Sequence, residues 1–369
     1  MVQKELAGRN MNKIPEDTRQ RTEPVALLRQ SNNKAQTAFC NHGAYYLLKR
    51  VLLPLMLIML LAALFAVGGC ADRGSPKISF GVLKGPSGIG AVYLMEQDGR
   101  GETISNYNFT IAGAPDALIA QLISGELNAA ALPSSTAATL YQKSEGRVLA
   151  LAVSTLGVLY FLENGNKING IEDLAGKTIV TSGQGSTVEY VLSYLLAAHG
   201  LRMGEDVTVD FKSEHTEAAT LAAAGNYEIA LLPEPFVTIL LNQNNEFRIA
   251  LDITAQWEQA GMGRLPMGVI AVNKDFASKN TGLITAFLSE YKTSVEYANG
   301  YPVETAALTE KYDIMPAAIA EKAIPRANIV YIAGPEMKNM LGAFYRILYD
   351  FNPAATGGSL PDDDFYYYR

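Results

Sequence analysis

Apolar residues recur along the chain after residue 77 at the spacings of alternating strands and helices. In 188–201 they fall at i, i+3, i+4 and i+7, the pattern of one helical face, and Gly200 ends the run. The segment 117–124 has the same spacing and ends at Gly125. Short apolar runs with the length of strands separate such helices. This alternation predicts an α/β protein whose parallel sheets are covered by helices on both faces.

The same part of the chain repeats itself at an offset of 100 residues. Residues 116–133 and 216–233 each read as a helix, a glycine, a short apolar strand and a proline. Upstream of them, 79–90 and 178–189 each read as an apolar strand that runs into a glycine-rich turn and then a helix. Two copies are too few for a solenoid. They predict two similar α/β lobes.

Two long apolar segments, 148–162 and 266–273, follow the first and the second copy. We expect both to be strands that cross between the lobes and form a two-strand hinge. The block 281–350 reads as helical, with prolines at helix starts, and is expected to pack on lobe one. The predicted boundaries are 77–155 with 266–369 for lobe one and 156–265 for lobe two.

An uncharged apolar stretch of eighteen residues, 51–68, follows Lys49 and Arg50, which is the layout of an export signal. It runs into Gly69-Cys70, and Val-Gly-Gly-Cys resembles the bacterial lipobox, where the signal is cut before a cysteine that carries lipid. An uncleaved membrane anchor of this length is the alternative. The predicted segments are a polar extension, disordered or upstream of the true start, at 1–44, the signal peptide at 45–69, and the lipidated Cys70 with its tether at 70–76.

Charge and cysteine content narrow the function classes. The chain has 30 Lys and Arg against 37 Asp and Glu, and residues 1–69 carry +5 while the remainder carries −12. An acidic body without a basic stripe excludes nucleic acid as the expected partner. Cys40 and Cys70 are expected to end in different molecules, which leaves no pair for a disulfide or a cysteine zinc site. The three histidines are scattered, so no metal and no cofactor is predicted.

Candidate ligand-binding residues lie in the turns that follow the strands. In open α/β sheets, ligands bind beyond the carboxyl ends of strands, against helix N-termini. Each lobe offers two such turns, at 85–88 and 134–135 in lobe one and at 185–187 and 234–235 in lobe two. For each serine, plain helix capping is the alternative. Glu234 either complements a helix dipole or accepts hydrogen bonds from a ligand amine or amide.

Other chemistry-bearing residues fit structural roles. Trp257 is expected in the core, with stacking on a flat ligand as the alternative. His215 beside Glu214 reads as a solvated surface pair. The glycines of 170–178 imitate a phosphate-binding loop, but five residues separate them and the segment precedes a strand. The chain has no G-x-S-x-G and no H-E-x-x-H motif, and no catalytic residue is predicted.

The lipobox, the tether and the two lobes form a known combination. Six stretches carry a resemblance that covers most of 77–276: GVLKGPSGIGAVYLME, ISGELNAAALPSSTAATLY, LAVSTLGVLYFLE, DLAGKTIVTSGQGSTVEYVLSYLL, ALLPEPFVTIL and PMGVIAVNKDF. The chain resembles the substrate-binding lipoproteins of bacterial ABC importers, and within them the nitrate, sulfonate, taurine and thiamine-precursor type. It departs from thiamine-precursor binders in lacking cysteines after Cys70. It departs from nitrate and sulfonate binders because Lys84 is the only basic residue of its turns.

The resemblance implies a type II periplasmic-binding fold that closes on a small organic molecule or anion and delivers it to a permease driven by an ATPase. It also implies a monomer without cofactor, held by a lipid anchor on the extracytoplasmic side of the cell membrane. An exported sensor subunit and an enzyme on the same fold are the alternatives. The implied ligand contacts are Ser87, Gly88, Ser134, Ser135, Thr155, Gly185, Ser186, Thr187, Glu234 and Pro235.

Overall fold

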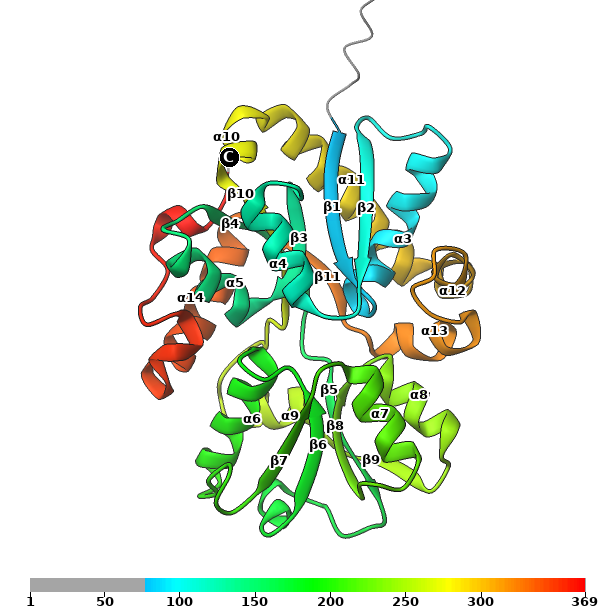
Figure 1. Cartoon of the computed structure of the whole chain (residues 1–369), viewed down its shortest axis with the longest axis vertical. Coiled ribbons are helices and arrows are strands. Elements are labelled where there is room, and N and C mark those ends of the chain that lie inside the picture. The colour runs from blue at the N-terminus through cyan, green and yellow to red at the C-terminus, as the bar shows by residue number, and fades with distance from the viewer. Residues whose placement is uncertain (1–76, 369) are drawn as a thin grey trace, which may run out of the picture. The chain divides into compact units, whose positions relative to one another are not determined.

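The strands form two separate sheets in the computed structural model, which describes residues 77–368 (Figure 1). Sheet A contains β1 (Lys77–Leu83), β2 (Asn106–Ala112), β3 (Ala129–Pro133), β4 (Val148–Thr155), β10 (Gly268–Asn273) and β11 (Ile329–Ala333). Its order is β11-β4-β10-β3-β1-β2. Sheet B contains β5 (Leu159–Asn164), β6 (Thr178–Ser182), β7 (Thr208–Lys212), β8 (Ile229–Pro233) and β9 (Phe247–Asp252). Its order is β7-β6-β8-β5-β9.

Helices pack on each sheet, and we call each sheet with its helices a lobe. Lobe one, around sheet A, has α3 (Pro86–Gly99), α4 (Pro115–Ser124), α5 (Ser134–Lys143), α10 (Lys274–Lys279), α11 (Thr281–Gly300), α12 (Pro302–Lys311), α13 (Ala317–Ala323) and α14 (Gly334–Phe351). Lobe two, around sheet B, has α6 (Thr187–Ala198), α7 (His215–Ala223), α8 (Phe236–Gln243) and α9 (Ile253–Gln259). Short 3₁₀ helices are η2 (Ile171–Leu174), η3 (Ile324–Arg326), η4 (Pro353–Thr356) and η5 (Asp363–Phe365).

The sequence repeat is confirmed as a structural repeat. In both sheets three consecutive strands run parallel in the same order, β2-β1-β3 in sheet A and β7-β6-β8 in sheet B. Gly125 and Gly225 both adopt φ of +82° just after α4 and α7, a left-handed conformation that glycine adopts without strain. Pro133 and Pro233 are both the last residue of a strand. The repeat therefore brings equivalent turns to the same end of each sheet.

The expectation of parallel sheets is correct for these strands and wrong for others. Strand β10 lies antiparallel between β3 and β4, and β5 lies antiparallel between β8 and β9. Each of these two strands is the first element after the chain enters a lobe. Gly268 pairs with Pro133, and Leu159 pairs with Pro233, so each strand starts at the carboxyl end of its neighbour. A chain that enters from the other lobe at this end must run against the strands already there.

Within residues 77–368 the chain passes between the sheets twice, as the predicted hinge requires. The expected continuous strand over 148–162 is interrupted, however, because β4 ends at Thr155 and β5 begins at Leu159. The short segment 156–158 makes the crossing. At Gly157 a Cβ would lie 2.0 Å from Thr254 Oγ1, so the crossing passes α9 at a distance that only glycine permits.

The predicted helix starts after residue 300 are confirmed, but the block is not entirely helical. Pro302 and Pro335 lie in the first turns of α12 and α14, and Pro316 directly precedes α13. The segment Ile329–Ala333, taken as part of a helical block, forms edge strand β11. Its run of β-branched and aromatic residues is typical of a strand. The block packs on lobe one as expected: Ser294 Oγ of α11 donates to Gly90 O at 2.7 Å.

The core of lobe one is aromatic at its centre. The fully buried Phe80 ring of β1 lies 5.0 Å from Phe287 and 5.9 Å from Tyr291, both on α11. At the C-terminal end Phe365, also fully buried, packs against Tyr141 and Tyr345. These contacts hold α11, α5 and α14 on sheet A.

Several sequence predictions lie outside the described residues. These are the extension at 1–44, the signal peptide at 45–69, and lipidated Cys70 with its tether at 70–76. Among the helices of residues 77–368, none is long and apolar enough to cross a membrane.

Candidate functional site

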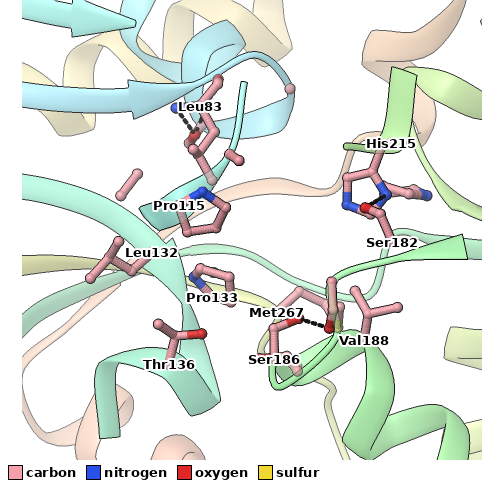
Figure 2. Close-up of a pocket in the computed structure, with 18 of the residues that line it drawn as sticks. Leu83, Pro115, Leu132, Pro133, Thr136, Ser182, Ser186, Val188, His215 and Met267 are labelled. Atoms are coloured by element: carbon pink, nitrogen blue, oxygen red, sulfur yellow. Dashed lines mark hydrogen bonds between the residues drawn. The ribbon is translucent and has the colours of Figure 1, made fainter. Parts of the chain in front are cut away.

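A cavity of about 640 Å³ lies between the two lobes. In each sheet it is next to the end at which the parallel strands finish. Residues that follow β1, β2 and β3 form the lobe-one wall, and residues that follow β6, β7 and β8 form the lobe-two wall. Figure 2 shows Pro115 and Thr136 on the first wall and Ser182, Ser186 and His215 on the second. This is the position at which open α/β sheets bind ligands.

Half of the predicted ligand-binding residues line this cavity. They are Ser87, Thr155, Gly185, Ser186 and Thr187. They come from the first turn of α3, the end of β4 and the turn before α6. The segments that carry them are far apart in sequence, and the sheet order brings them to one place.

The other predicted residues do not line the cavity, because they are packed inside the protein or bonded to its other residues. Gly88 packs inside α3, where a Cβ would lie 2.7 Å from Leu83 O. Ser134 is fully buried and donates its hydroxyl to Pro266 O at 2.8 Å. Ser135 is also fully buried and contacts Thr187. The remaining two, Glu234 and Pro235, precede α8 and are buried behind the wall.

Glu234 has its own partners on both lobes. Its carboxylate is fully buried and lies 2.6 Å from the guanidinium of Arg326, while Thr238 N–H donates to it at 3.1 Å. Burial raises the pKa of the Glu234 carboxyl, and Arg326 and Thr238 oppose this rise by stabilising the carboxylate. Of the two roles considered for Glu234, the ligand contact is not supported, since Arg326 occupies the carboxylate.

The serine hydroxyls of the lining also make local bonds. Ser186 Oγ donates to Gly183 O at 2.6 Å, and Ser87 Oγ accepts from Leu83 N at 3.1 Å. Both hydroxyls therefore stabilise their own turns. The hydroxyl proton of Ser186 is used in the bond to Gly183 O, but the hydroxyl oxygen keeps lone pairs that can accept a hydrogen bond from a ligand.

His215 is the residue whose placement differs most from the sequence interpretation. It is half-buried in the cavity wall instead of lying with Glu214 in solvent. Its Nδ1 lies 2.8 Å from Ser182 Oγ (Figure 2). Its ring centroid is 5.3 Å from that of Phe236. Desolvation by the surrounding protein lowers the pKa of the imidazole to about 4. The ring is neutral at pH 7, with one nitrogen that donates and one that accepts.

The charges around the cavity nearly balance. Lys84 Nζ lies 3.1 Å from Asp313, and Lys212 Nζ lies 2.9 Å from Asp210. Lys143, Asp116 and Glu214 also line the cavity, and none of them forms a salt bridge within the described part of the chain. Much of the remaining surface is apolar, with Leu83, Ile119, Leu132, Val158, Val188, Phe211, Phe236 and Met267.

Comparison with known families identifies this architecture. Residues 94–320 match the family model described as the phosphonate ABC transporter periplasmic substrate-binding protein. The chain belongs to this family. It is the substrate-binding component of an ABC transporter, which confirms the importer resemblance and the function predicted from the sequence.

Solved structures agree with the family in fold. An ABC transporter protein from Parabacteroides distasonis has 26% identity and a TM-score of 0.66, with 79% of this chain and 99% of that chain covered. The periplasmic aliphatic sulphonate-binding protein of Escherichia coli has 17% identity and a TM-score of 0.61, covering 75% and 88%. The periplasmic nitrate-binding protein of Synechocystis PCC 6803 has 12% and 0.59, covering 76% and 82%. No curated protein matches significantly.

The sequence interpretation of this binding protein missed two of the turns that line the cavity. They follow β2 and β7 and contain Gly113–Asp116 and Ser213–His215. The repeat carried the missing signal: because 116 aligns with 216, Pro115 and His215 are equivalent first residues of α4 and α7. A turn at one site of a repeat predicts the corresponding turn in the other lobe.

The two lobes of the binding protein touch directly at the cavity. Ser135 N–H on α5 donates to Thr187 Oγ1 on α6 at 3.0 Å, and the two hydroxyls are 3.2 Å apart. Both residues are fully buried.

In the described residues no group of three or more His, Cys, Asp or Glu side chains is arranged to hold a metal ion.

Proposed function

We propose that the cavity is the solute site of this binding protein and that it takes a small organic molecule with one polar head. The supporting observation is position, because the cavity lies beyond the carboxyl ends of strands from both sheets and both lobes supply its walls. Lobes that close around a solute enclose it and hold it for transfer to a permease.

The polar head would meet helix N-termini. The first turns of α3, α4, α6 and α7 contribute to the lining, and a helix N-terminus attracts anionic or polar groups through its N–H groups and dipole. Lys143 adds one cation at the wall. Because Lys84 and Lys212 are neutralised by aspartates, we infer a head with one negative charge or none, in preference to a dianion.

The rest of the molecule would lie on the apolar wall. Sites for organic ligands of moderate size have volumes of roughly 300–1,000 Å³ with mainly apolar linings, and this cavity has about 640 Å³. Water in contact with Phe211, Phe236 and Met267 would be released by an apolar group. The proposed solute is therefore an alkyl or aryl compound with a small oxyanion or amide head.

This proposal predicts which solutes stabilise the protein. Alkanesulfonates and monoesterified alkylphosphonates that carry an apolar group are expected to raise the melting temperature by about 5–10 °C at saturating concentration. Nitrate and inorganic phosphate are expected to leave it unchanged. Thr136→Trp, which fills the cavity from α5, should abolish the shift, while Thr293→Trp on the exposed face of α11 should keep it. Thermal unfolding measures the shift, and native mass spectrometry of the purified protein counts bound molecules.

An equal shift with nitrate would contradict an organic solute, and a shift that survives Thr136→Trp would move the site elsewhere. The same spectra test whether the protein acts without catalysis, as we propose. Ser182 and His215 form a hydroxyl–imidazole pair of the kind that activates nucleophiles. Recovery of an added solute at unchanged mass supports a binding role for the pair, and a converted product would favour the enzyme alternative.

We further propose that the mature protein is a monomer anchored by lipid on Cys70, facing the extracytoplasmic side. The support is the apolar signal that ends in Gly-Gly-Cys. Several acyl chains on one cysteine anchor stably, whereas a single chain does not. Cys70→Ser is expected to move the protein from the membrane to the aqueous fraction and to abolish labelling with a fatty-acid analogue. Retention in the membrane by the variant would support an uncleaved apolar anchor instead; Cys40→Ser is the matched control.

A further inference from the structure

An ion pair between Arg326 and Glu234 joins the two lobes beside the cavity. Arg326 belongs to η3, which packs among α11, α12 and α13 of lobe one. Its Nε donates to Glu234 Oε1 at 2.7 Å, and its Nη2 donates to Thr238 Oγ1 at 2.9 Å. Both partners are in lobe two: Glu234 lies two residues before α8, and Thr238 lies in the first turn of α8. The guanidinium therefore bridges the two lobes by at least two hydrogen bonds.

The position of Glu234 connects this bridge to the solute site. Pro233, the residue before it, and Phe236, two residues after it, both line the cavity. Phe236 in turn packs on His215 at 5.3 Å. A shift of Glu234 relative to Arg326 would thus displace the lobe-two wall relative to lobe one.

The bridge also lies next to a crossing of the chain between the lobes. Two residues after Arg326, Asn328 accepts from Leu156 N–H at 3.0 Å through its carbonyl and donates its side-chain amide to Gly157 O. Asn328 has φ of +43°, in the region that few residues other than glycine adopt. Segment 326–328 therefore holds both the crossing and α8.

We infer that Arg326 and Glu234 form a clamp that holds the lobes in the arrangement seen in this structure and so sets solute affinity without contact with solute. The reason is burial. Glu234 is fully buried, and a buried charge that loses its partner is strongly disfavoured, whereas loss of both charges together is tolerated. Without Arg326, the lobes would separate to let water reach the carboxylate. The part that concerns affinity rests on the proposed solute site.

Lobe separation can be measured without any solute, so the test does not depend on the solute site. We would place nitroxide labels at Ser124→Cys on α4 and Thr220→Cys on α7, both exposed, with Cys40 and Cys70 changed to serine. Pulsed electron resonance on the full chain then gives the distance distribution across the cleft. The four proteins compared are the labelled parent, Glu234→Gln, Arg326→Met and the double variant.

The clamp predicts a specific pattern. Arg326→Met should lower the population at the parent's short distance about tenfold. The double variant should restore most of it, because no unpaired buried charge remains. Arg326→Lys, which keeps the charge, should lie between. Lys322→Met is the matched control: Lys322 also crosses to lobe two, where it donates to Asn242 at 3.0 Å, but this contact is exposed and should matter little.

Two outcomes would overturn the inference. If Arg326→Met lowers the melting temperature but leaves the distance distribution unchanged, the pair stabilises the fold and does not control closure. If the double variant is as open as Arg326→Met, the coupling between the two charges is absent. Far-UV circular dichroism on each variant shows that the lobes remain folded, so that an open distribution reports separation and not unfolding.

Discussion

Replacement of Gly157 by alanine is expected to lower the free energy of unfolding by about 3 kcal/mol, as overpacking of a tight contact does. The new Cβ would lie 2.0 Å from Thr254 Oγ1, 2.7 Å from its Cγ2 and 2.8 Å from its Cβ. Rotation of the threonine cannot clear all three atoms. Thr254 N–H is also bonded to the capping carboxylate of Asp252 at 2.8 Å, so the first turn of α9 resists displacement.

Chemical denaturation followed by circular dichroism measures this loss. Thr254→Gly in the Gly157→Ala background should recover part of the stability, while Thr254→Ala should recover less because its Cβ stays in contact. Gly282→Ala is the control: it lies in the first turns of α11 with nothing near its Cβ position, and should be neutral or stabilising. Parent-like stability of Gly157→Ala would show that the crossing segment has room to move.

The contrast between Gly157 and the repeat glycines shows what the sequence could predict. Gly125 and Gly225 end helices whose apolar spacing is visible in the sequence, so their role follows from local pattern. Gly157 is constrained by Thr254, nearly one hundred residues away. No local pattern reports that contact, and the apolar run around Gly157 read as one continuous strand.

The residues of the candidate site also divide into those that local sequence pattern predicts and those whose role depends on a distant part of the chain. Turn residues such as Ser186 and Thr187 were predicted because strand, glycine and helix follow one another in the sequence. The assignment of Glu234 to the ligand failed because its partner, Arg326, comes from a different part of the chain and from the other lobe. A carboxylate at a helix start looks the same in sequence whether solute, solvent or a distant arginine pairs with it.

The interpretation of His215 as a solvated surface residue was wrong for a related reason, since it rested on the neighbouring Glu214. Its burial depends on Phe236 and on Ser182, both brought to it by the order of strands in sheet B. The sequence pattern predicts the helix that begins at His215, but it does not predict which residues cover the imidazole ring. Burial of a single titratable group has a consequence for stability that can be tested directly.

Stability is expected to fall as the pH is lowered from 7 to 5, by about 2 kcal/mol from His215 alone. The pKa of His215 is about 4 in the folded protein, against an ordinary value of 6.5. Between these values the unfolded chain binds a proton that the folded protein does not, so acid favours unfolding. The contribution is complete above pH 6.5 and is lost as the pH falls towards 4.

The window separates His215 from Glu96. The hydrogen bond from Lys311 lowers the pKa of Glu96 to about 2, so its stabilisation is lost only below its ordinary value of 4.5. Urea unfolding at pH 7 and pH 5 should therefore show a large difference in the parent and a small one in His215→Gln. Ser182→Ala should keep the difference, because burial and not the hydroxyl lowers the pKa. Equal pH dependence in the parent and His215→Gln would mean that water reaches the ring from the cavity, and that the wall around His215 is open in solution.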